Sequence, residues 1–194
     1  MSLVTNNLGE NINTAVNVLI DTYKNLDSLF VELDRIGEEE GFISLTPRFL
    51  RWKSDTDPSG WLPTNFIKLY QLEADPDVPG ELGLKSGSLF GVEVDLEAND
   101  YPTISLTRYT YDYSIWSKVP SISDHWVFYG PFRYENLFNI NENNGLWTSE
   151  PLEKAQKRYW GIQKAVSRDI PLLEITDPET IRTKVFQGLD LLPR

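Results

Sequence analysis

The chain has 194 residues, of which 40% are hydrophobic and 12% aromatic, and its formal net charge at pH 7 is −11. This composition suffices for a large core and argues against intrinsic disorder. The absence of cysteine and the single histidine, His125, exclude disulfides, thiol nucleophiles, zinc–thiolate centres and multi-histidine metal sites. The negative charge argues against binding nucleic acid or anionic membranes, unless the protein imitates nucleic acid.

Residues 1–41 predict a long amphipathic helix that ends at Gly37 or Gly41. Seven apolar residues follow alternating spacings of four and three, which places them on one stripe of a helix. They are Ile12, Val16, Leu19, Tyr23, Leu26, Phe30 and Leu33. Two arrangements are open: the helix packs across a sheet of its own chain, or the stripe forms the seam of a homodimer.

Residues 42–147 predict a β-rich core, because short apolar segments alternate there with turns rich in proline and glycine. Strands are expected at 47–53, 65–73, 89–97, 103–111 and 125–130, with a long loop at 74–88 and a turn at 98–102. Strands joined in this way form an antiparallel sheet, for which one covered face is expected.

The alternation within 89–97 predicts which side chains share a face. Phe90, Val92, Val94 and Leu96 are expected to face the core beside Ile104 and Leu106. The solvent-facing side then carries Glu93, Asp95 and Glu97 next to Thr103, Ser105 and Thr107, and it continues into Tyr109, Tyr111 and Tyr113. Such a face suits a divalent cation, a sugar or a cationic peptide, and it equally suits the plain solvated side of an amphipathic strand.

Two aromatic segments contain further candidate residues. His125 stands in the expected strand 125–130 beside Asp124. Adjacent strand residues point to opposite faces, so Asp124 is a poor partner for the imidazole, and a structural role is favoured over catalysis. Trp61 lies in the turn-rich sequence "SDTDPSGWLP", where an exposed indole would mark a binding loop and a buried one would only hold the loop in place.

Residues 148–194 predict one or two helices. Leu152, Ala155, Tyr159, Ile162 and Val166 form the apolar stripe of the first, which Pro171 ends. Asp177 and Pro178 begin the second, which Gly188 ends. The whole chain is therefore expected to be a single α+β domain with segments 1–41, 42–147 and 148–194. With no bilayer-spanning apolar run and no signal-peptide pattern, a cytoplasmic location is expected.

The chain contains neither a phosphate-binding glycine loop nor a G-x-S-x-G elbow, and no cofactor or metal is expected. The sequence favours a non-enzymatic binding or accessory module, of the immunity, inhibitor or phage type, that recognises a partner with a basic surface. The candidate binding residues are Glu93, Asp95, Glu97, Tyr109, Tyr111, Tyr113 and Trp61. The alternative is a carboxylate-based hydrolase or a metal-dependent enzyme that uses Glu93, Asp95 and Glu97, which requires a concave pocket.

Overall fold

The computed structural model describes residues 2–98 and 101–194. The chain forms two compact units, one that extends to Arg35 and one from Ile36 to Arg194. Helix α1 (Ser2–Glu39) confirms the predicted amphipathic helix; it forms the first unit, and its last residues, from Ile36, belong to the second. It passes through Gly37 and ends before Gly41, which adopts a φ of +80° that favours glycine. Within the described residues, no helix is both long and apolar enough to cross a bilayer.

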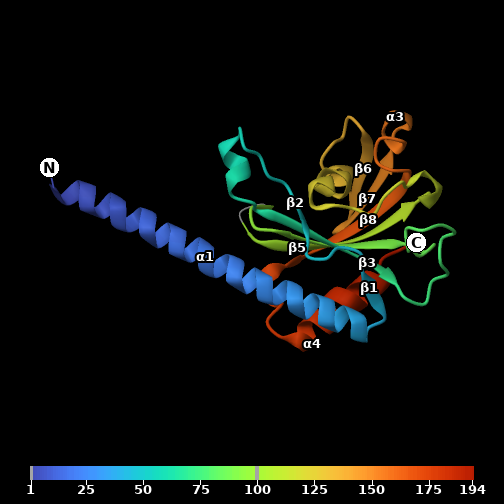
Figure 1. Ribbon diagram of the computed structural model, residues 1–194, viewed down its shortest axis with the longest axis horizontal. Coiled ribbons are helices and arrows are strands. Elements are labelled where there is room, and N and C mark those ends of the chain that lie inside the picture. Colours follow the sequence, from blue (N-terminus) through green and yellow to red (C-terminus); the bar gives the residue numbers. More distant parts are fainter. Residues whose placement is uncertain (1, 99–100) are drawn as a thin grey trace. The chain divides into compact units, whose positions relative to one another are not determined.

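The second unit is built on one antiparallel sheet, which confirms the predicted α+β class (Figure 1). The order of the strands is β1-β3-β4-β5-β8-β7-β6, and β2 also pairs with β3. The strands are β1 (Phe42–Ser44), β2 (Leu50–Arg51), β3 (Asn65–Leu72), β4 (Leu89–Asp95), β5 (Thr103–Tyr111), β6 (Phe138–Asn143), β7 (Leu146–Pro151) and β8 (Ile162–Pro171).

The centre of the sheet agrees closely with the prediction. Strands β3, β4 and β5 fall within the expected ranges 65–73, 89–97 and 103–111. Val92 pairs with Leu106 and Val94 with Ile104, as the alternation predicts. Residues 99 and 100 of the predicted turn at 98–102 lie outside the described part of the chain.

The C-terminal helices cover the face of the sheet that carries Phe90, Val92 and Val94. They are α4 (Pro178–Thr180), a π-helical turn (Ile181–Phe186) and α5 (Gln187–Asp190). Phe42 packs against both Phe90 and Phe186, with ring centroids 5.3 and 5.1 Å apart. Gly188 lies inside α5, where a Cβ would come within 2.7 Å of Leu106, so this glycine permits close packing and does not end the helix.

The opposite face of the sheet is covered as well, which the sequence did not predict. Residues 113–132 form short helical turns over it, among them α2 (His125–Tyr129). The ring of Tyr109 meets Phe128 of α2 edge-to-face at 5.9 Å. The prediction that this side of β4 faces solvent is therefore wrong for Glu93, which is only 3% exposed.

The predicted strand at 125–130 is wrong, because these residues form helix α2. Asp124 explains the difference. Its carboxylate accepts hydrogen bonds from the backbone N–H and the hydroxyl of Ser121, at 2.8 and 2.6 Å. This capping arrangement fixes a helical turn just before His125.

The predicted helix with the apolar stripe from Leu152 to Val166, ended by Pro171, is also wrong. This region contains the end of β7, the single turn α3 (Glu153–Gln156) and the start of β8. Trp160 and Gly161 have φ values of +56° and +79°, which interrupt any right-handed helix. Strand β8 then pairs with β5 on one side and β7 on the other. The β6–β7 hairpin was not predicted, although Asn144-Gly145, with φ of +52° and +74°, is a typical hairpin turn.

Candidate functional site

Polar side chains from three neighbouring strands form a row on the face of the sheet below residues 113–132. Glu93 of β4 pairs in register with Ser105 of β5, which pairs with Asp169 of β8. Residues directly opposite on antiparallel strands share a face. The Ser105 hydroxyl donates to Asp169 Oδ1 at 2.6 Å, and the sheet thus places two carboxylates and a hydroxyl side by side.

A second polar pair lies in the next row of the same face. Thr107 of β5 is in register with Ser167 of β8, and their hydroxyl oxygens are 2.9 Å apart. Ser167 is also in register with Trp147 of β7. Both hydroxyls are buried, so the polar patch continues into the interior from the Glu93 row.

Arg133 supplies the positive charge of the site. Its Nη2 donates to Glu93 Oε1 at 2.6 Å and to Asp95 Oδ2 at 3.3 Å. The guanidinium also lies over the ring of Tyr129, with Cζ 3.9 Å from the ring centroid, in a cation–π contact. Burial raises the pKa of Glu93 although Arg133 and Asn65 both oppose that shift. Burial alone would lower the pKa of Arg133, but Glu93 raises it above its ordinary value.

Asn65 connects Glu93 to His125. The amide Nδ2 of Asn65 donates to Glu93 Oε1, and its Oδ1 lies 2.6 Å from His125 Nε2. Because the amide oxygen only accepts, the imidazole carries its proton on Nε2. Burial lowers the pKa of His125 to about 4, with a further contribution from Arg133. His125 is therefore a neutral donor at pH 7 that holds Asn65, and its ring stacks on Tyr129 at 4.9 Å.

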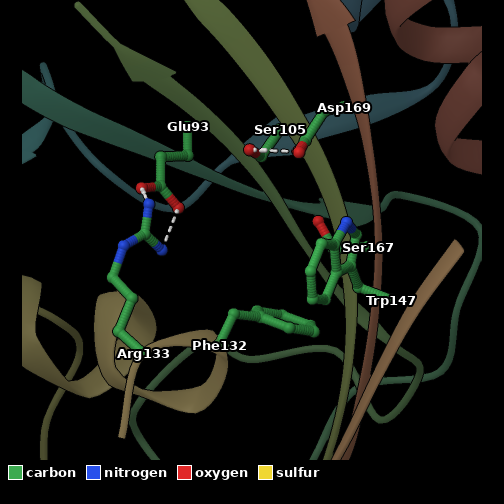
Figure 2. Close-up of a pocket in the computed structure, with 7 residues that line it drawn as sticks. All are labelled: Glu93, Ser105, Phe132, Arg133, Trp147, Ser167 and Asp169. Atoms are coloured by element: carbon green, nitrogen blue, oxygen red, sulfur yellow. Dashed lines mark hydrogen bonds and ion pairs between the residues drawn. The ribbon is translucent and has the colours of Figure 1, made fainter. Parts of the chain in front are cut away.

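A cavity of about 130 Å³ opens beside these groups. It is lined by Glu93, Ser105, Phe132, Arg133, Trp147, Ser167 and Asp169. Figure 2 shows the Glu93–Arg133 pair on one side and the Ser105–Asp169 pair on the other, with the ring of Phe132 between Arg133 and Trp147 in this view. Ser149 of β7 donates to the carbonyl of Pro131, which ties the turn that carries Phe132 to the sheet. We call these seven residues the Glu93 cavity.

The three predicted acids do not form one group. Glu93 is buried in the cavity, and Asp95 is half-buried and accepts a bond from Arg133. Glu97 is exposed and accepts a bond from the Thr64 hydroxyl at 2.9 Å. Within residues 2–98 and 101–194, no group of three or more histidine, cysteine or acidic side chains has an arrangement that could hold a metal ion.

The three predicted tyrosines belong to the core, so the expectation that they are exposed is wrong. The hydroxyl of Tyr109 donates to the carbonyl of Phe128 at 2.9 Å, and that of Tyr113 donates to the carbonyl of Gly87 at 3.0 Å. Tyr111 is buried between them and meets Trp116 edge-to-face at 5.2 Å. Trp61, in contrast, is 67% exposed, as a contact residue on a loop would be.

The sequence reasoning missed five residues of the Glu93 cavity, which are Phe132, Arg133, Trp147, Ser167 and Asp169. Ser167 and Asp169 were expected in the last part of a helix that Pro171 ends, so their register with β5 was hidden. Trp147 was not assigned to a strand. Arg133 could have been found, because a single cation directly after the aromatic run 125–132 requires a carboxylate partner if it is buried.

Comparisons of the chain with models of protein families, with curated proteins and with solved structures find no match.

Proposed function

We propose that the protein binds a small polyhydroxylated ring, of the size of one monosaccharide unit, in the Glu93 cavity. The observation that carries this proposal is the convergence of charged and hydroxyl groups on a sheet face whose neighbouring residues form an apolar core. Buried ionic groups contribute little net stability compared with apolar side chains of similar volume. The buried Glu93–Arg133 pair is therefore better explained by a ligand than by folding, and Asp169 is exposed, where a ligand can reach it.

The size of the cavity supports a ligand with a single ring. Its volume of about 130 Å³ is close to that of an apolar protein cavity of about 150 Å³ that accepts benzene. The rings of Phe132 and Trp147 offer apolar surfaces against which the C–H face of a sugar can pack. A whole peptide or nucleotide exceeds this volume, so the cavity holds a single ring or side chain.

The polar groups support hydroxyls as the recognised chemistry. Glu93 and Asp169 accept hydrogen bonds, Arg133 donates them, and the serine hydroxyls do both. Glu93, Asp95 and Asp169 together outweigh the one positive charge of Arg133. The site therefore favours neutral or cationic ligands and disfavours anionic ones.

The test is calorimetric titration with three matched series: neutral monosaccharides, amino sugars and hexuronates. We expect at least one neutral or amino sugar to bind and the hexuronates to fail. Trp147→Ala and Asp169→Asn should each weaken binding by tenfold or more, whereas Trp61→Ala removes an exposed indole elsewhere and should leave it unchanged. Binding of none of the neutral or amino sugars would overturn the proposal.

A second candidate is a carboxylate-based hydrolase that acts on a glycoside in the same cavity. The observation that favours it is that Glu93 and Asp169 line one cavity while burial raises the pKa of Glu93. Glycosidases need one carboxyl group as acid and a second as base or nucleophile. Release of nitrophenol from aryl glycosides, lost in Glu93→Gln, would support this activity, and sugar binding without any turnover would count against it.

Recognition of a basic protein partner through the acidic and aromatic side chains remains a prediction. The surface available to such a partner is smaller than the sequence predicts, because four of the predicted contact residues are buried: Glu93, Tyr109, Tyr111 and Tyr113. Trp61 and Glu97 are the exposed members of that set.

A further inference from the structure

A second, larger groove shares none of the lining residues of the Glu93 cavity. It runs between residues 45–53 and 119–126 and has a volume of about 960 Å³, the upper end of the range for small-ligand pockets. Leu50 and His125 lie buried at its base, whereas Trp52, Val119 and Ile122 are exposed along it. Exposed apolar side chains gathered around a groove are typical of a binding surface.

The charge of this groove is opposite to that of the chain. Arg48, Arg51 and Lys53 line it, and no acidic residue does. The chain as a whole has 29 acidic and 18 basic side chains, so a positive, acid-free lining stands out against its surroundings. Such complementarity directs an anionic partner to the groove.

Both walls of the groove are held by the fold. Strand β2 is fixed to β3 by the pairs Leu50–Ile67 and Arg51–Phe66. Among the described strands it pairs with β3 alone, and the turn Ile122–Asp124 packs close to it. The opposite wall is fixed by Asp124, whose carboxylate accepts hydrogen bonds from Ser121 and from Lys118 at 2.6 Å. A groove lined by apolar side chains between two segments that are each fixed by hydrogen bonds suits a peptide in an extended conformation.

We infer that this groove binds an extended, acidic peptide segment of a partner protein, anchored by aliphatic or aromatic side chains. The apolar residues Trp52, Val119 and Ile122 receive the anchors, and Arg51 and Lys53 attract the acidic side chains of the peptide. The groove is far larger than the Glu93 cavity, so it takes several residues and not a single ring. This role is independent of the ligand proposed for the Glu93 cavity.

The test is selection of a displayed library of random 12-residue peptides against the full-length protein, followed by fluorescence anisotropy of the enriched peptides. The charge-reversal variant R51E/K53E is compared with K154E/K157E, which makes the same charge change at exposed residues outside the groove. A further variant, Ile122→Asp, removes an apolar anchor site. Circular dichroism and thermal unfolding establish that each variant is folded.

We expect the enriched peptides to combine glutamate or aspartate with aliphatic or aromatic residues. Their affinity should fall at least tenfold for R51E/K53E and for Ile122→Asp, and remain within twofold of the wild type for K154E/K157E. Raising the salt concentration should weaken binding. The inference is overturned if nothing is enriched, if the peptides are basic or lack acids, or if R51E/K53E binds as tightly as K154E/K157E. If the protein bound vesicles of anionic lipid as tightly as it binds the enriched peptides, the groove would be a membrane-binding surface, and the inference would also be overturned.

Discussion

Arg133 determines whether the buried carboxylate of Glu93 can remain charged. Arg133→Met removes the partner at 2.6 Å and leaves a buried charge uncompensated, which should cost about 3 kcal/mol of stability. Adding Glu93→Gln should restore most of the loss, because the neutral amide keeps the shape of the carboxylate. Urea unfolding of the wild type, the two single variants and the double variant measures the coupling free energy between Arg133 and Glu93. Additive effects would contradict a direct ion pair between these residues.

The burial of His125 should make the stability of the protein depend on pH, and one substitution can separate this contribution from those of the other titrating groups. Burial holds its folded pKa near 4, below the ordinary value of about 6.5. Protons therefore bind the unfolded state more readily, and the contribution of His125 to stability is present above pH 6.5 and is lost as the pH falls through 4. The difference amounts to about 3 kcal/mol.

The measurement is urea unfolding of the wild type and His125→Gln between pH 4 and 7. The wild type should lose more stability than the variant as the pH falls, and the two stabilities should run parallel at a pH where the imidazole is neutral in both the folded and the unfolded state. Since His125 is the only imidazole in the chain, its NMR titration gives the folded pKa without assignment. A midpoint near 6.5 would show that the ring is not buried beside Arg133.

Among the elements, strand β8 (Ile162–Pro171) matters most for the site, because its pairing with β5 brings Asp169 beside Ser105. A strand with neighbours on both sides should exchange its amide hydrogens only on global unfolding. We expect β8 and β5 to be among the slowest amides in hydrogen exchange, and β6, at the end of the sheet order, to exchange faster. Fast exchange throughout β8 would contradict the arrangement of the site.

Helix α1 predicts self-association. Ile12 and Val16, at the start of its apolar stripe, are 66% and 47% exposed, and the near-heptad spacing suits a two-helix seam. Light scattering should give twice the chain mass of 22.3 kDa, and I12E/V16E should reduce it to that of a monomer. Val18→Glu, an exposed change off the stripe, should leave the dimer intact. A wild-type monomer at high concentration would exclude the seam.

Local patterns were sufficient for some elements and not for others. The alternation in 89–97 predicted β4 and its register with β5, because side-chain period and turn spacing are local properties. It did not reveal that Glu93 is buried, since the covering layer comes from residues 113–132, distant in sequence. The apolar stripe from Leu152 to Val166 was compatible with a helix. Trp160 and Gly161 adopt positive φ values in the middle of this stripe, and a helix cannot continue through them. Partners such as Arg133 and Asp169 depend on tertiary contacts that no local pattern contains.

The second unit as a whole carries two kinds of surface. The Glu93 cavity is polar and carries more acids than bases, whereas the groove beside β2 is apolar and carries only bases. A protein selected for stability alone would have little reason to keep the buried Glu93–Arg133 pair in the first or the exposed indole of Trp52 in the second.

The most direct test of the Glu93 cavity is an NMR titration of the ¹⁵N-labelled protein with the tightest-binding monosaccharide of the calorimetric series. The amides of Ser105, Ser167 and Asp169 and the indole of Trp147 should shift together and saturate, while the exposed indole of Trp61 stays in place. Shifts confined to residues 45–53 and 119–126, or no saturable shift at all, would contradict a ligand site on this face of the sheet.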